Sequence, residues 1–168
     1  MTSLMFHHKE VVSAQLPDRI LVKGKWLDLF TNPLEQFWQL THKRRPSFCT
    51  RYNCTRGYVA KWDIKDNELY LLSVEGNYFK RNLLFQRRRI ACTLNSIFRR
   101  SVYYPVKAFW FSGKLRIPQG KMLEYEHENY NSRFEKETII TVDKGNIVKS
   151  VTIDNKEHEL SINYEIIE

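Results

Sequence analysis

Residues 104–120 read YPVKAFWFSGKLRIPQG and carry the most regular side-chain pattern in the chain. In an extended strand, successive side chains point to opposite faces. Between residues 109 and 117 one face of this stretch is then apolar and holds Phe109, Phe111, Gly113, Leu115 and Ile117. The other face changes from apolar to charged along Val106, Ala108, Trp110, Ser112, Lys114 and Arg116. We predict a strand that crosses the core and emerges into solvent, followed by a type I turn at residues 117–120.

Shorter segments on both sides of this stretch also alternate and are predicted to be strands. They cover residues 19–30, 58–64, 69–74, 121–128, 133–143, 147–153 and 159–167. In residues 58–64 one face holds Tyr58, Ala60, Trp62 and Ile64. The segment DKGN at residues 143–146 is typical of the connection in a β-hairpin.

One segment, near residues 33–43, has helical spacing of its apolar side chains. Leu34, Phe37 and Trp38 fall on one face, Pro33 suits the first helical position, and Asn32 suits the cap. Together these patterns predict a mainly β fold at the margin of α+β. We expect an antiparallel meander of about eight strands that forms a sandwich or barrel, with one N-terminal helix near 33–43.

The length of 168 residues suits one domain, because a chain of this size can bury one full core. Within a single domain spanning 1–168, we expect a loose arm at residues 1–18 and a basic excursion at residues 76–101. No apolar run approaches the ~20 residues of a membrane span. No secretory signal is recognisable at the start of the sequence, so a cytoplasmic protein is expected.

Charge is distributed unevenly along the chain, whose formal net charge is +8. Residues 76–123 contain eleven Lys or Arg and neither Asp nor Glu, whereas residues 124–168 contain eleven acids and five bases. This asymmetry predicts either an external acidic partner for the middle segment or pairing between the middle segment and the tail. The sequence leaves both interpretations open.

Two elements of the sequence carry a resemblance to other proteins. Residues 56–71 read RGYVAKWDIKDNELYL, and residues 110–125 read WFSGKLRIPQGKMLEY. They resemble a group of small uncharacterised bacterial proteins that share W-x-I-x-D-x-x-L-Y-L and W-F-S-G-x-L-R-x-P-x-G elements, and the similarity covers residues 56–148. The resemblance implies a shared fold and a bacterial or phage origin. It implies no activity, and the pattern of the group has fewer arginines between the two elements.

Catalytic chemistry has little support in the sequence, and we lean against an enzyme. Glu124, Glu126 and Glu128 share one face of a predicted strand, beside His127, and are interpreted as a solvated face or as counter-charges rather than an acid/base or metal site. Cys54 lies near two arginines, yet a buried structural cysteine is the preferred interpretation. The motifs GxSxG, HExxH, GxGxxG and the P-loop are absent. We predict no catalytic residue, no metal site and no cofactor.

Arginines interleaved with aromatic residues form the candidate binding surface. We predict a non-enzymatic protein-binding module of immunity-protein or inhibitor type, whose basic surface meets an acidic toxin, host protein or defence protein. The candidate partner-binding residues are Arg87, Arg88, Arg89, Arg99, Arg100, Trp110, Lys114 and Arg116. The alternative is that the same surface binds RNA or single-stranded DNA. A third interpretation pairs the cations near residue 116 with the glutamates at 124–128.

Overall fold

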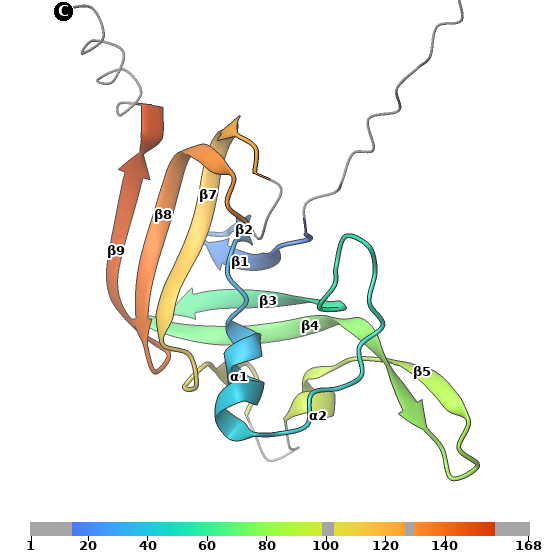
Figure 1. The fold of residues 1–168 in the computed structure, drawn as a ribbon. Helices are drawn as coiled ribbons and strands as arrows, with labels where there is room; N and C mark the ends of the chain where they lie inside the picture. The colour runs from blue at the N-terminus through green and yellow to red at the C-terminus, as the bar shows by residue number, and fades with distance from the viewer. Residues whose placement is uncertain (1–14, 99–102, 127–129, 157–168) are drawn as a thin grey trace, which may run out of the picture.

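The computed structural model describes residues 15–98, 103–126 and 130–156. It is mainly β (Figure 1). The elements in chain order are β1 (Asp18–Val22), β2 (Lys25–Leu29), α1 (Pro33–Thr41), β3 (Tyr58–Lys65), β4 (Glu68–Arg81), β5 (Arg87–Ala91), α2 (Leu94–Ile97), β6 (Val106–Lys107), β7 (Gly113–Glu124), β8 (Arg133–Asp143) and β9 (Asn146–Asp154). The predicted strand at residues 159–167 and most of the predicted arm lie outside the described residues.

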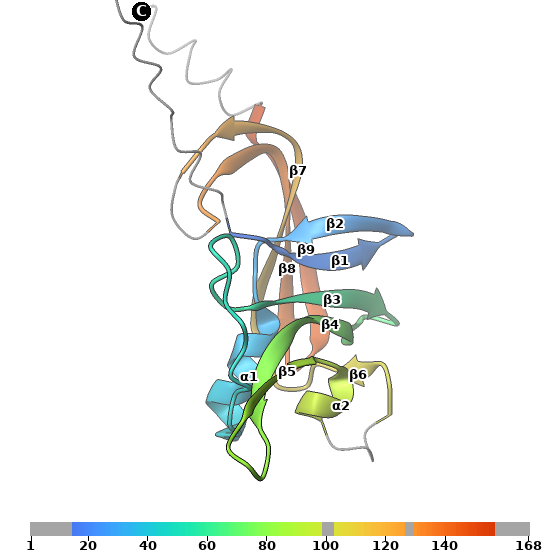
Figure 2. The same ribbon diagram turned by 90° about the vertical axis from the view of Figure 1, so that its right-hand side faces the viewer.

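The strands form one mixed sheet that is bent into a nearly closed barrel. Its order is β2-β1-β3-β4-β9-β8-β7, with β5 and β6 attached to β4. Figures 1 and 2 show β3 and β4 crossing the direction of β7, β8 and β9. The two seams of the barrel are weak: β4 and β9 share the single pair Glu68 and Asn146, and Phe30 N–H donates to the Arg116 carbonyl at 2.8 Å beside β2 and β7.

The prediction of an antiparallel meander is wrong. β1 pairs with β3 in parallel, and β4 is followed along the sheet by β9 rather than by the next long strand. The physical reason is the connection between β2 and β3. A parallel pair needs a long crossover, and α1 with residues 42–57 supplies it.

The helix begins at the predicted residue but differs from the prediction in extent and place. It spans Pro33–Thr41 and stops two residues before the predicted end, because His42 takes a left-handed conformation with φ 53°. Since β1 and β2 precede it, the helix is not the N-terminal element. Pro33 occupies the first turn as predicted, whereas the Asn32 side chain makes no capping hydrogen bond.

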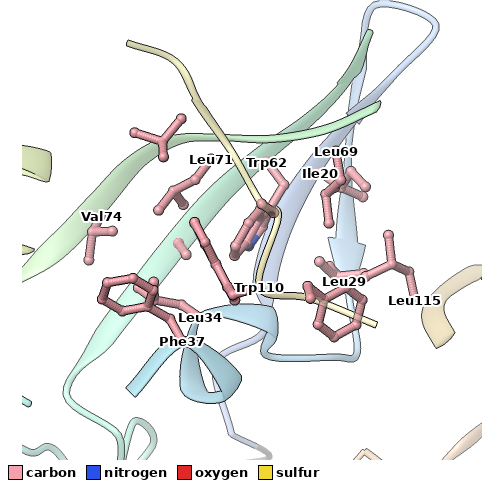
Figure 3. Close-up of a cluster of buried hydrophobic side chains, with 14 of the residues drawn as sticks. Ile20, Leu29, Leu34, Phe37, Trp62, Leu69, Leu71, Val74, Trp110 and Leu115 are labelled. Carbon is pink, nitrogen blue, oxygen red and sulfur yellow. The ribbon is translucent and has the colours of Figure 1, made fainter. Parts of the chain in front are cut away.

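The core fills the space between the helix and the inner face of the sheet (Figure 3). Strand β3 was predicted correctly, and its alternate residues Tyr58, Ala60 and Trp62 are buried. From α1, Leu34 and Phe37 belong to the same buried cluster and the Trp38 ring packs on Tyr58, as the helical spacing predicted. The connection expected at residues 143–146 is present, with Lys144 and Gly145 between β8 and β9, and a similar turn at Asp66 and Asn67 joins β3 to β4; all four residues have positive φ.

The patterned stretch 104–120 is not one continuous strand. It contains β6, then a turn in which Phe111 N–H donates to the Ala108 carbonyl at 2.9 Å, and then β7. Phe109, expected inside, is 59% exposed, because the turn takes it out of the alternation. The predicted turn at 117–120 is also wrong. β7 continues through Pro118, which pairs with Glu137 of β8. Proline has no N–H to donate, and it is tolerated here because β7 is the last strand in the sheet order and has few backbone partners on its other side.

None of the described helices is long and apolar enough to cross a membrane.

Candidate functional site

The second half of β4 leaves the barrel and forms a hairpin with β5. Strand β4 pairs with β3 as far as Gly76, where a Cβ atom would lie 2.6 Å from the Gly57 carbonyl oxygen. This close approach explains the glycine at the junction. Beyond it, residues 77–81 pair with β5 along their length and no longer with β3, and we call residues 77–91 the basic hairpin. In both ribbon views it extends away from the rest of the sheet (Figures 1 and 2).

Like charges face one another across the basic hairpin. Lys80 is paired with Arg88, and Arg81 is paired with Arg87. Directly opposed like charges destabilise an antiparallel pair. All of β5 is exposed, so these charges are well hydrated in the free protein. Cations occupy both faces of the hairpin, since neighbouring residues of each strand point in opposite directions.

None of the five cations in the basic hairpin forms an ion pair with a described residue. The ion pairs between described residues all involve other side chains. Elsewhere in residues 76–123, which we call the acid-free segment, some cations do form ion pairs. Lys107 pairs with Glu68, and Arg116 pairs with Glu137 at 2.7 Å. Pairing between the middle segment and the tail, one of the two interpretations of the charge asymmetry, therefore holds for Arg116, whereas Lys107 pairs with an acid that precedes the middle segment and the basic hairpin has no such pair among the described residues.

A groove lies along one side of the basic hairpin, between it and residues 47–51. This neighbouring segment is held to β4 because Cys49 N–H donates to the Asn77 carbonyl and Phe79 N–H donates to the Ser47 carbonyl. The groove has a volume of about 630 Å³ and is lined by Ser47, Phe48, Cys49, Thr50, Arg51, Phe79, Arg87 and Arg89. Its lining contains three arginines and no acid. The Arg87 guanidinium lies over the Phe79 ring, 4.3 Å from its centroid.

The structure brings together only part of the predicted binding set. Arg87, Arg88 and Arg89 are neighbours on β5, and Lys114 is exposed on β7. Arg99 and Arg100 lie outside the described residues. Lys80 and Arg81, which complete the basic hairpin, were missing from the predicted set. The signal for them was the same run of unopposed cations.

Trp110 lies in the core and not on a binding surface. It is 4% exposed, its indole N–H donates to the Pro33 carbonyl at 3.1 Å, and its ring packs against Phe37 and Phe98. The face of the chain that was expected to reach solvent is covered at this position by α1, which contributes Phe37. Trp110 therefore supports the fold and is unavailable to a partner.

Arg116 is also occupied within the chain. Its Nε and Nη2 donate to the two carboxylate oxygens of Glu137 at 2.8 and 2.7 Å, and further N–H groups donate to the carbonyls of Tyr130 and Ser132. These contacts with Arg116 lower the pKa of Glu137. The third interpretation predicted internal pairing correctly for Arg116 but named the wrong acids, because the acid comes from β8.

Glu124 and Cys54, two other candidate chemical groups that the structure describes, have contacts within the chain. Glu124 lies 3.7 Å from Arg133 on the neighbouring strand, while His127 and Glu128 lie outside the described residues. The Cys54 thiol is buried and donates to the Tyr58 carbonyl at 3.3 Å. Within residues 15–98, 103–126 and 130–156, no group of His, Cys, Asp and Glu is arranged to hold a metal ion.

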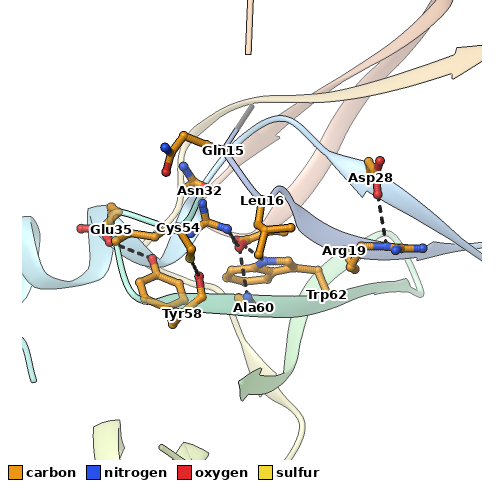
Figure 4. A network of polar contacts seen from close by, with 12 residues as sticks. Gln15, Leu16, Arg19, Asp28, Asn32, Glu35, Cys54, Tyr58, Ala60 and Trp62 are labelled. Carbon is orange, nitrogen blue, oxygen red and sulfur yellow. Dashed lines mark hydrogen bonds and ion pairs between the residues drawn. The ribbon is translucent and has the colours of Figure 1, made fainter. Parts of the chain in front are cut away.

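A buried polar cluster around Asp18 was not foreseen. Its carboxylate accepts hydrogen bonds from Ala60 N–H at 3.0 Å, Trp62 Nε1 at 3.1 Å and Arg56 Nη2 at 2.9 Å (Figure 4). Burial raises the pKa of Asp18 to about 6. Arg56 also donates to the Tyr130 hydroxyl at 2.8 Å. The cluster therefore fixes the start of β1 to β3, at the end of the segment that was predicted to be a loose arm.

Fold and site together define a small, mainly β protein in which a basic hairpin extends from a nearly closed, barrel-like sheet. No protein-family model, curated protein or solved structure compared with the chain matches it. The resemblance to small bacterial proteins stays a prediction.

Proposed function

We propose that the chain is a protein-binding module of immunity-protein or inhibitor type, and that the basic hairpin docks on an acidic partner protein. The observation that carries the proposal is the absence of ion pairs at Lys80, Arg81, Arg87, Arg88 and Arg89 within the described chain. Lys107 and Arg116, which belong to the same acid-free segment, do have acidic partners.

The energetics of the hairpin support an external anion. Each directly opposed like-charge pair costs roughly 0.2–1 kcal/mol in an antiparallel ladder. Two such pairs lie in succession, Lys80 with Arg88 and Arg81 with Arg87. Carboxylates of a partner would remove this repulsion and gain charge-assisted hydrogen bonds, while the long-range field would raise the rate of association. Immunity proteins and inhibitors work by such occupation of another protein.

A second candidate is binding of RNA or single-stranded DNA. The observation that favours it is the groove, where the partly exposed Phe79 ring lies among Arg51, Arg87 and Arg89. An aromatic ring among arginines can stack a base while the cations contact phosphates. The ring, however, already has the Arg87 guanidinium over it, so a base would have to stack on that guanidinium or displace it.

Recovery of a partner from the native host tests the proposal. Tagged wild-type protein is expected to recover one stoichiometric protein, and the triple variant R87E/R88E/R89E is expected to bind the purified partner about 100-fold or more weakly, because each reversal replaces attraction by repulsion. Circular dichroism checks that the variant is folded. Failure to recover any protein, or equal binding by the variant, would contradict the proposal.

The matched control carries the same change in net charge at exposed lysines away from the hairpin. K25E/K65E/K149E alters residues of β2, β3 and β9 that make no ion pair with a described residue. It is expected to bind within about threefold of wild type, since exposed charges remote from an interface contribute little. Mixed-sequence oligonucleotides test the second candidate: binding at low salt that falls steeply as salt increases would support nucleic acid instead.

A further inference from the structure

We infer that Leu83, Leu84 and Phe85 are the apolar anchor of this interface, and that the partner receives them in an apolar pocket edged by carboxylates. This inference rests on the proposed function and names the chemistry of the partner's site. We call the three residues the hairpin tip.

All three side chains of the hairpin tip are apolar, and all three are strongly exposed to solvent. Leu83 is 99% exposed, Leu84 is 74% exposed and Phe85 is 81% exposed. Single exposed apolar side chains are ordinary on protein surfaces, whereas consecutive ones at the end of a projecting element mark interaction sites. Burial of such side chains provides affinity that charge alone does not supply.

The backbone of the hairpin tip is held in place before any partner binds. The Asn82 carboxamide oxygen accepts hydrogen bonds from Leu84 N–H at 3.0 Å and Gln86 N–H at 2.9 Å. Phe85 N–H donates to the Asn82 carbonyl at 3.0 Å, and the side chains of Asn82 and Gln86 also bond to each other. A preorganised loop loses less conformational entropy on binding. This organisation suits a pocket of defined shape.

Phe85 adopts an unusual backbone conformation for its residue type. Its φ of 59° lies in the left-handed region, which bulky residues rarely occupy and which glycine and asparagine accept easily. The turn alone would therefore be formed at lower cost with a small residue. An aromatic residue at this position is explained if its ring contacts the partner.

Charge around the hairpin tip indicates the chemistry of the pocket rim. Arg81 and Arg87, paired across the hairpin, are the first charged residues behind the tip on each strand. An apolar pocket that accepts the tip would bring its own edge against these guanidinium groups. Carboxylates at that edge would match them, with the bidentate geometry that arginine favours.

The position of the groove favours a protein over a flat membrane surface. Phe79, Arg51 and Arg89 lie along the side of the basic hairpin, beside residues 47–51, and not at its tip. A planar bilayer that receives the tip lies across the end of the hairpin. A partner that contacts both tip and groove must be curved around the hairpin, as the walls of a protein cleft are.

A display selection tests the inference while the natural partner is still unidentified. Random peptides displayed on phage are selected on the full-length protein, and selected sequences are synthesised and titrated. We expect peptides that combine Asp or Glu with aromatic or aliphatic residues. The variant L83S/F85N is expected to bind them about tenfold or more weakly. Asparagine at position 85 accepts the left-handed backbone, so the turn is retained.

The control is Val148→Ser, which removes a 65% exposed apolar side chain from β9. It is expected to bind the peptides within about twofold of wild type, as surface substitutions away from an interface usually do. Peptides enriched in acids alone, or L83S/F85N binding like wild type, would overturn the inference and leave the proposed function standing.

Two further probes separate failure of the inference from failure of the proposed function. Vesicles of phosphatidylcholine with phosphatidylglycerol, and mixed-sequence oligonucleotides, are titrated with wild type and with L83S/F85N. Binding to vesicles that depends on the hairpin tip would overturn the inference in favour of a membrane. Enrichment of no acidic peptide, together with binding to oligonucleotides, would overturn both proposals.

Discussion

Asp18 is a fully buried carboxylic acid, whereas the other described acids apart from Glu137 are exposed or partly exposed. Desolvation raises its pKa from 3.8 to about 6, although Arg56 and two further N–H donors favour the ionised form. The folded protein therefore holds the proton more tightly than the unfolded chain does. The contribution to the free energy of unfolding is complete below pH 3.8 and is lost as the pH rises through about 6.

A pH titration of stability tests this residue. The free energy of unfolding of wild type, minus that of Asp18→Asn, is expected to fall by about 3 kcal/mol between pH 3.5 and 7, since one pKa unit corresponds to about 1.4 kcal/mol. Urea unfolding followed by tryptophan fluorescence measures both proteins. A difference that is constant with pH would show that folding does not shift the pKa of Asp18, and one that increases would show that folding lowers it; either result would contradict the prediction.

At the scale of the element, the basic hairpin is expected to gain stability when its charge is reversed. Arg88→Glu places a carboxylate opposite Lys80 and replaces a repulsive pair by an attractive one. We expect the free energy of unfolding to rise by roughly 0.5–1 kcal/mol, while affinity for the partner falls. Thermal unfolding and a binding titration on the same variant measure the two effects. If the sequence of the hairpin is instead optimised for folding alone, Arg88→Glu will lower the free energy of unfolding, and that result would contradict the prediction.

Sequence predicted those elements whose one face is buried. The alternation of Tyr58, Ala60 and Trp62 identified β3, because burial on one side of a strand imposes period two. The same reasoning missed residues 79–81 of β4 and all of β5, where every residue is exposed and no alternation exists. The unopposed arginines identified the region, and only the register placed Lys80 opposite Arg88.

Other parts of the fold depend on contacts that no local pattern contains. The stretch 104–120 is apolar on both faces from Ala108 to Phe111, so its periodicity does not show where the chain turns; packing of Trp110 under α1 decides it. The acid that pairs with Arg116 follows from the register of β7 against β8, which brings Glu137 within reach. Neither could be derived without the tertiary structure.

At the scale of the whole molecule, Trp110 connects the helix to the barrel. Its ring packs on Phe37 of α1 and on Phe98, and its indole N–H bonds to the Pro33 carbonyl. Trp110→Ala is expected to cost about 3–5 kcal/mol of unfolding free energy, the range for truncation of a large core side chain. Urea unfolding measures the loss. If Trp110→Ala instead keeps its stability and fails to bind a partner, Trp110 contributes to the binding surface rather than to the core.

The association rate between the recovered partner and the basic hairpin tests the central claim most directly. Stopped-flow mixing at low and at high salt compares wild type with R87E/R88E/R89E. For wild type we expect a rate that falls about tenfold or more as salt screens the attraction, and for the triple variant a slow rate with little salt dependence. Equal rates and equal salt dependence for the two proteins would contradict the claim that the basic hairpin meets an acidic partner.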